Sequence, residues 1–157
     1  MTNDLDLMAD LPEVKVADLV AALESEFYVD DRAIRRAIRG RSSFNLIHLA
    51  TMFKVDVFLH RGDEWAKEQM RRSQSKSLIE GVGSTSRKVS SAETMILQKL
   101  LWFRKGGEVS DRQWRDVLGM MKVQAERLDF DYLNQWADSL QISDLLERSL
   151  KKAGIHQ

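Results

Sequence analysis

The side chains best suited to chemistry are three carboxylates on two short apolar stretches. Asp4 and Asp6 alternate with leucines in residues 3–9, and Asp56 interrupts the β-branched and aromatic residues of 54–59. Strand residues at i and i+2 share a face, and Asp is depleted in strands. Carboxylate oxygens suit Mg²⁺, and two such ions can clamp the attacking and leaving oxygens of a phosphoryl displacement. We therefore predict adjacent strands whose three carboxylates converge on divalent ions.

The alternative for these carboxylates is a strand face that simply contacts water. Asp-x-Asp is a common sequence, and composition alone favours this alternative. The metal-site prediction would be lost if Asp56 lay on the opposite sheet face from Asp4 and Asp6.

Composition narrows the classes of protein. The 157 residues suffice for one domain with a substantial core, and 43% hydrophobic content with zero formal net charge argues against disorder or bulk polyanion binding. The absence of cysteine excludes thiol chemistry, and His48, His60 and His156 are too scattered for a zinc site. The acidic, polar start is unlike a signal peptide, and no apolar run reaches the length of a membrane span. We expect a cytoplasmic protein with no membrane contact.

Hydrophobic periodicity predicts the elements that position these residues. The last third reads as helices opened by caps at Ser90, Ser110, Asp129 and Ser143, and Asp30 caps an earlier helix that Gly40 ends. The fold class is α+β: a small mixed sheet with flanking helices, then a C-terminal helical bundle, with residues 1–89 and 90–157 packed as one compact unit. The expected strands are 3–9, 43–49, 53–60, 76–82 and 86–89, with 27–29 extended, and the expected helices are 15–26, 31–39, 63–72, 91–105, 111–126, 130–140 and 144–153.

Several segments in their order resemble one known superfamily over about residues 2–152. They are TNDLDL (2–7), KVDVF (54–58), SAETMILQKL (91–100), SDRQWRDV (110–117) and LDFDYL (128–133). Together they resemble the nucleotidyltransferase superfamily with the polymerase-beta-like fold. The chain is more closely similar to bacterial nucleotidyltransferase-like proteins related to abortive-infection and toxin–antitoxin systems.

The resemblance implies a function and a set of site residues. Asp4 and Asp6 match the first carboxylate pair and Asp56 the third, so they would bind Mg²⁺ (or Mn²⁺) and help to activate the incoming hydroxyl. Lys99 and Asp116 match polar positions near the nucleotide, although ordinary helix-surface charge is the alternative for both. The implied reaction transfers a nucleoside monophosphate from a nucleoside triphosphate to a hydroxyl of RNA or protein.

One departure from the family pattern concerns the phosphates. The family places a glycine-rich turn before the carboxylate pair, whereas here the pair begins at residue 4 and Gly81-x-Gly83-Ser84 follows Asp56. The chain resembles a shortened relative, or one whose start lies further upstream. We expect weakened nucleotide binding and an apolar patch or strand edge left uncovered near residues 3–9. The alternative function is a non-catalytic interaction protein of a toxin–antitoxin-type system, whose helical tail binds a protein partner.

Two further sets of residues allow nucleic-acid contact. One set is basic and could contact phosphates of a nucleic acid or nucleotide. The alternative interpretation of this set is a solvated face that is paired with local acids. The other set is the four tryptophans, whose helical spacing indicates core positions, with base stacking by Trp102 as the alternative. The basic residues are Arg32, Arg35, Arg36, Arg39 and Arg41 in one helix, and Arg71, Arg72, Lys76, Arg87 and Lys88 in the following loop region; the tryptophans are Trp65, Trp102, Trp114 and Trp136.

Overall fold

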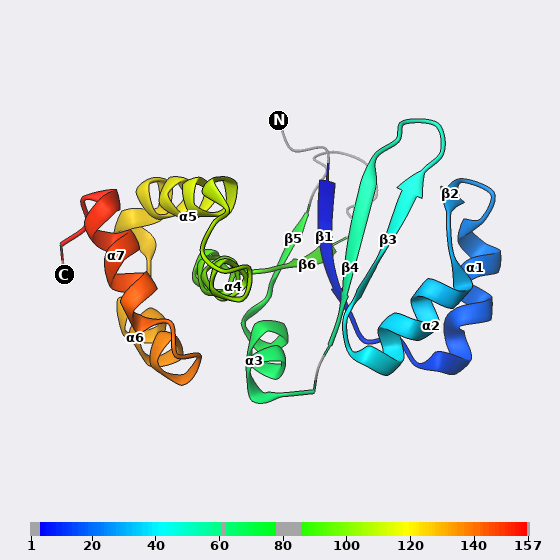
Figure 1. Ribbon diagram of the computed structural model, residues 1–157, viewed down its shortest axis with the longest axis horizontal. Helices are drawn as coiled ribbons and strands as arrows, with labels where there is room; N and C mark the ends of the chain where they lie inside the picture. Colours follow the sequence, from blue (N-terminus) through cyan, green and yellow to red (C-terminus); the bar gives the residue numbers. More distant parts are fainter. Residues whose placement is uncertain (1–3, 61, 78–85, 157) are drawn as a thin grey trace. The chain divides into compact units, whose positions relative to one another are not determined.

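The chain folds as an α+β protein whose computed structural model describes residues 4–60, 62–77 and 86–156 (Figure 1). It divides into two compact units, Met1–Lys67 and Glu68–Gln157. The division falls inside helix α3 (Glu64–Arg72), whereas the sequence placed a boundary after residue 89. The predicted fold class is confirmed: a small mixed sheet with flanking helices precedes a helical region.

The first unit is built on a four-stranded sheet with strand order β1-β4-β3-β2 (Figure 1). β1 (Asp4–Ala9) runs parallel to β4 (Lys54–Leu59), so the two strands predicted to carry the carboxylates are neighbours. β3 (Ser43–His48) is antiparallel both to β4 and to β2 (Phe27–Tyr28).

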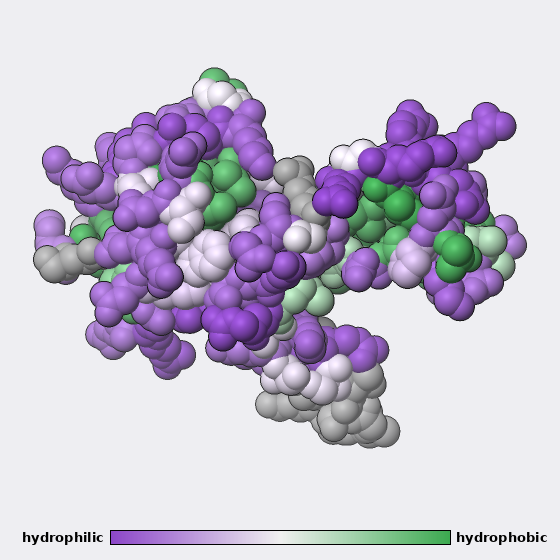
Figure 2. Space-filling view, turned by 90° about the horizontal axis from the view of Figure 1, so that it is seen from below, coloured by the Kyte–Doolittle hydropathy of each residue, from purple (hydrophilic) through white to green (hydrophobic). Residues whose placement is uncertain are grey.

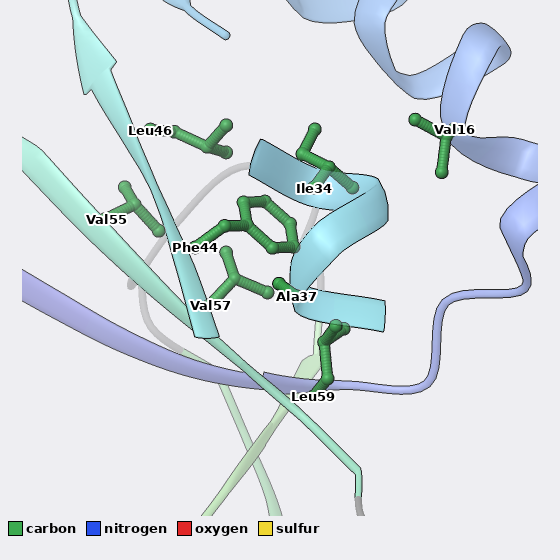
Figure 3. Packing of buried hydrophobic residues seen from close by; sticks show 8 residues of the cluster. All are labelled: Val16, Ile34, Ala37, Phe44, Leu46, Val55, Val57 and Leu59. Carbon is green, nitrogen blue, oxygen red and sulfur yellow. The ribbon is translucent and has the colours of Figure 1, made fainter. Parts of the chain in front are cut away.

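Two helices cover one face of this sheet. They are α1 (Val16–Leu23), which follows the 3₁₀ turn η1 (Glu13–Lys15), and α2 (Asp31–Gly40). Period-2 alternation in β3 and β4 turns their apolar residues toward the helices, and Figure 3 shows the Phe44 ring against α2. The buried core consists of Val16, Ile34, Ala37, Phe44, Leu46, Val55, Val57 and Leu59.

The second unit joins a two-stranded hairpin to helices. β5 (Gln74–Ser77) pairs antiparallel with β6 (Ser86–Val89), while residues 78–82 of the predicted strand lie outside the described part of the chain. Leucine and isoleucine positions at helical spacing fill the core of this unit, including Ile96, Leu97, Leu133 and Leu145, each fully buried. The helices are α4 (Ala92–Lys105), α5 (Asp111–Gln124), the 3₁₀ turn η2 (Ala125–Arg127), α6 (Phe130–Ser139) and α7 (Ser143–Ala153).

Helix starts follow side-chain chemistry at most positions. Asp30, Ser110 and Asp129 each accept a hydrogen bond from the backbone N–H three residues on, as predicted. Two predicted caps are wrong. Ser91 rather than Ser90 caps α4, through the Thr94 N–H. The position before α7 is Ile142, because Ser143 is itself the first helical residue and its hydroxyl bonds to Asp138. Gly40 is the last residue of α2, and Arg41 takes the left-handed conformation (φ 45°) that follows it.

The face drawn in Figure 2 is mainly polar. Figure 2 shows hydrophilic residues over most of the visible face, with apolar residues confined to small patches. Among the described helices, none is both long and apolar enough to cross a membrane.

One apolar feature does remain open, on β1. Among the described strands β1 has β4 as its sheet neighbour, and its core-side residues Leu5 and Leu7 are 46% and 44% exposed. Their register partners Val55 and Val57 are buried. This is the uncovered patch expected near residues 3–9, and open apolar strand edges favour association.

We expect the chain to self-associate through β1. Static light scattering should give a mean mass that rises with concentration, and a Leu5→Lys/Leu7→Lys variant should lower it toward that of a monomer. A Val14→Lys/Val123→Lys variant adds the same charge at residues that are 82% and 80% exposed, and should leave association unchanged. A wild-type chain that stays monomeric across the concentration series would contradict the prediction.

Candidate functional site

The strongest candidate site is a row of oxygen-bearing side chains across three strands. The parallel register pairs Asp6 on β1 with Asp56 on β4. Register partners on neighbouring strands lie about 5 Å apart and carry their side chains on the same face. That face is opposite the one that α1 and α2 cover, because Val55 and Val57, which flank Asp56, are buried in the core. The metal-site prediction required Asp56 to share a sheet face with the carboxylates of β1, and Asp6 and Asp56 meet this requirement.

Asp4 lies two residues before Asp6 on β1. Its backbone pairs with Lys54 of β4, and its side chain lies outside the part of the chain that the structure describes. The convergence of all three carboxylates therefore stays a prediction.

Asn45 extends the row and was not identified from the sequence. The antiparallel register of β3 and β4 places it opposite Asp56, on the same face, and its side chain is exposed. Asn45 alternates with the buried Phe44 and Leu46 in the same strand, just as Asp56 alternates with valines. That shared alternation is the sequence signal that would have found it.

A lysine partly neutralises the row. Lys54 Nζ lies 2.8 Å from Asp56 Oδ2, and the two side chains are 44% and 22% exposed. Both lie on the same strand face two residues apart, so the pair follows from strand geometry. A cation binding at Asp56 would have to displace or share this contact, which lowers the net affinity expected from the carboxylate alone.

The donor set fits a hard divalent ion. Asp6, Asp56 and Asn45 offer carboxylate and amide oxygens, and Mg²⁺ is commonly held by one or two carboxylates together with water and substrate phosphates. Within the described residues no three His, Cys, Asp or Glu side chains are grouped closely enough to hold a metal ion by themselves. Any ion at this row would therefore need ligands beyond the described carboxylates.

Lys99 and Asp116 are brought together in the second unit. Lys99 Nζ of α4 donates to Asp116 Oδ2 of α5 at 3.0 Å, and the side chains are 19% and 42% exposed. The pair ties two packed helices, so helix-to-helix ion pairing is sufficient to explain both residues. A role in nucleotide contact stays a prediction.

The second unit also holds a denser polar cluster, which sequence reasoning assigned to a basic loop. Arg72 Nη2 binds Asp129 Oδ2 at 3.0 Å, lies 3.9 Å from Glu93 Oε2, and its guanidinium stacks 3.8 Å from the centre of the Tyr132 ring. Glu93 also accepts the Asp129 N–H, and both Glu93 and Tyr132 are buried. The arrangement joins the end of α3 to the starts of α4 and α6.

The pKa values of this cluster follow its contacts. The Tyr132 N–H, and then the guanidinium of Arg72, lower the pKa of Asp129. A hydrogen bond from Arg71 lowers the pKa of Glu68. Burial, reinforced by the charge of Glu68, raises the pKa of Tyr132 to about 12. Arg71 and Arg72 are thus engaged with acids, and the predicted basic loop is reduced to Lys76, Arg87 and Lys88 of the hairpin.

The tryptophans are less uniformly buried than predicted. Trp65 is 7% exposed, whereas Trp102, Trp114 and Trp136 are partly buried. Trp114 packs against the Phe103 ring at 5.2 Å, and the guanidinium of Arg148 lies 4.4 Å from its centre. Base stacking by Trp102 stays a prediction.

No known family, curated protein or solved structure matches this chain in comparisons of sequence and fold.

Proposed function

We propose that the chain is a nucleotidyltransferase-like protein of the cytoplasm, which transfers a nucleoside monophosphate from a nucleoside triphosphate to a hydroxyl of RNA or protein. The observation that carries this proposal is the parallel register that sets Asp6 beside Asp56 on the face opposite the helices. The resemblance of the ordered segments supports it. In this proposal Asp4, Asp6 and Asp56 hold Mg²⁺ or Mn²⁺, which supplies the charge that stabilises the phosphates in the transition state.

The chain's own residues have separate tasks. Asp6 and Asp56 fix the ion on two hydrogen-bonded strands, where backbone pairing limits their movement. Lys54 holds Asp56 when no cation is bound and, once released, is a cation available to a phosphate. Lys99 and Asp116 take the nucleotide-contacting role that the resemblance assigns, which requires their mutual ion pair to open.

A specific observation favours the non-catalytic alternative. Leu5 and Leu7 leave an apolar stripe open on β1, on the sheet face opposite the candidate metal row, and Lys54 already pairs with one carboxylate of that row. An interaction protein of a toxin–antitoxin-type system would use such an open surface for its protein partner.

Thermal melts with and without Mn²⁺ test the metal site. Because an ion that binds only the folded chain stabilises it, we expect Mn²⁺ to raise the melting temperature of the wild type. The gain should be lost in an Asp4→Asn/Asp6→Asn variant, which without metal should melt at or above the wild-type temperature because carboxylate repulsion is removed. An Asp18→Asn/Asp63→Asn variant removes two carboxylates elsewhere in the same unit and should keep the gain. Equal metal shifts in all three proteins would contradict the site.

Label transfer separates the two functions. Incubation with Mn²⁺ and a nucleoside triphosphate labelled at the α-phosphate should label RNA or protein in the wild type and not in the Asp4→Asn/Asp6→Asn variant. A metal shift without any transfer would favour the non-catalytic alternative. The absence of both a metal shift and label transfer would overturn the enzyme proposal.

A further inference from the structure

The outer side of α2 carries a stripe of arginines without described partners. At 3.6 residues per turn, Arg32, Arg36 and Arg39 fall within about 60° of one another around the helix axis. All three are exposed, and within the described residues none forms a hydrogen bond or an ion pair. The core residues Ile34 and Ala37 lie on the opposite side of the helix, so the stripe points away from the sheet.

Three acids close to the stripe in the fold already have partners. Asp31 and Glu13 pair with Arg35, and Asp30 caps the helix through the Ala33 N–H. The expectation that the basic face would be paired with local acids therefore holds for Arg35 and not for the stripe. Like charges at i and i+4 destabilise a helix by about 0.2–0.5 kcal/mol per pair, so the stripe has a cost that no described contact offsets.

The unit around the stripe is acidic. Residues 1–67 contain nine Lys or Arg and twelve Asp or Glu, a formal charge of −3. Any attraction to a polyanion must therefore come from the stripe locally and not from the overall charge of the unit.

The chemistry of the stripe selects one kind of partner. We infer that the outer face of α2 (Arg32, Arg36 and Arg39) binds the phosphate backbone of a duplex nucleic acid. Arginine forks match phosphate oxygens, and backbone binding needs cations alone. A protein interface would combine arginines with buried aromatic anchors, and a single-strand site would need stacking rings. The residues interleaved with the stripe, Ala33, Arg35 and Gly40, provide neither.

This surface is separate from the carboxylate row. α2 lies on the helix-covered face of the sheet, whereas Asp6 and Asp56 lie on the other face of the same unit. The inference therefore stands whether or not the chain transfers nucleotides. Because the inferred contacts are to phosphates and not to base edges, we expect binding without sequence preference.

Fluorescence anisotropy with a labelled 20-base-pair DNA of arbitrary sequence tests the inference. Three phosphate contacts predict that affinity falls about 40-fold between 50 and 200 mM salt, a log–log slope of about −3. An Arg32→Gln/Arg36→Gln/Arg39→Gln variant should bind at least about tenfold more weakly at 50 mM salt, with a slope near zero. Its melting temperature should equal or exceed that of the wild type, because the exposed repulsion is gone.

The matched control removes the same charge elsewhere. Lys122→Gln/Lys151→Gln/Lys152→Gln changes three exposed cations of α5 and α7 and should retain wild-type binding. An equal loss in this control would show attraction by overall charge and overturn the inference. A Lys76→Gln/Arg87→Gln/Lys88→Gln variant tests the β5–β6 hairpin. If this variant lost DNA affinity while the stripe variant kept it, the binding site would be the hairpin and the inference would be overturned.

Competitors identify the partner class. Duplex RNA and duplex DNA should both displace the label, and their ratio reports which groove geometry the helix prefers. A single strand that competes better than a duplex, or polyglutamate that competes equally at equal charge, would overturn the assignment to a duplex backbone.

Discussion

An Arg72→Met variant should lower the free energy of unfolding of the second unit by about 2–4 kcal/mol, because removing one partner of a partly buried charge cluster leaves the buried Glu93 uncompensated. Arg72 is 27% exposed, and the Glu93 side chain that it faces is 9% exposed. Without the guanidinium, Glu93 keeps one described donor, the Asp129 N–H, and the Tyr132 ring loses its stacked cation. Methionine retains most of the length of the chain and so limits any cavity.

Urea unfolding followed by tryptophan fluorescence measures this loss, since Trp102, Trp114 and Trp136 all lie in the second unit. Arg115→Met is the control, because Arg115 is exposed on α5 and its Nε donates to the Asp111 carbonyl oxygen at 3.3 Å. The free energy of unfolding of this control variant should lie within about 0.5 kcal/mol of the wild-type value.

A double-mutant cycle with Glu93→Gln shows whether the loss comes from the ion cluster. If Glu93 is the residue left uncompensated, Arg72→Met should cost less in the Glu93→Gln background than in the wild type. A loss below about 0.5 kcal/mol in Arg72→Met itself would show that the cluster does not hold the three helices together.

The sheet was predictable because each strand repeats a simple period. Val55, Val57 and Leu59 alternate with polar residues in β4, and one face of the strand had to be buried. The same alternation placed Asp6 and Asp56 on the side away from the helices. The parallel register that sets them opposite each other depends on the route of the chain through α1 and α2, which local periodicity does not contain.

The partners of charged side chains could not be predicted from the sequence where the contact joins residues far apart in the chain. Arg72 and Asp129 are 57 residues apart, and Lys99 and Asp116 belong to different helices. A charged residue on a helix gives the same sequence pattern whether it faces water or another side chain. The sequence therefore left Arg72 open between nucleic-acid contact and a solvated face, and Lys99 open between the nucleotide position that the resemblance implies and ordinary helix-surface charge. Only the packing of α3, α4 and α6 shows that Arg72 is engaged with acids.

Helix starts show the same limit on a smaller scale. Ser90 and Ser91 both precede α4, and a shift of one residue decides which hydroxyl meets the Thr94 N–H. The sequence pattern Ser-x-x-Glu favoured Ser90, but Glu93 is committed elsewhere, to the Asp129 N–H. A tertiary contact thus removed the acid on which the predicted capping box depended.

The second large effect concerns alkaline pH and Tyr132. Its hydroxyl is buried near Glu68 and Thr94 without a hydrogen bond of standard geometry to either, and burial together with the charge of Glu68 raises its pKa to about 12 from an ordinary 10. In the unfolded chain the phenol ionises near pH 10, whereas in the folded chain it stays protonated until about pH 12. The unfolded state therefore binds fewer protons over this interval, and stability falls as the pH rises.

We expect a Tyr132→Phe variant to remove this loss. The contribution of Tyr132 to the free energy of unfolding should decline by roughly 1 kcal/mol per pH unit from pH 10 toward 12. Lysines also titrate there, so the quantity to measure is the difference between wild type and variant in urea unfolding at pH 8, 10 and 11. At pH 8 the two should agree within about 1 kcal/mol, because no hydrogen bond of standard geometry is lost with the hydroxyl.

Two outcomes would contradict this account of the cluster. A variant much less stable than the wild type at pH 8 would mean that the hydroxyl makes a bond of consequence. A difference between the two proteins that stays constant from pH 8 to 11 would mean that Tyr132 ionises as an ordinary tyrosine. Tyr28→Phe, which changes a tyrosine that is 56% exposed in β2, is the control and should follow the wild type at every pH.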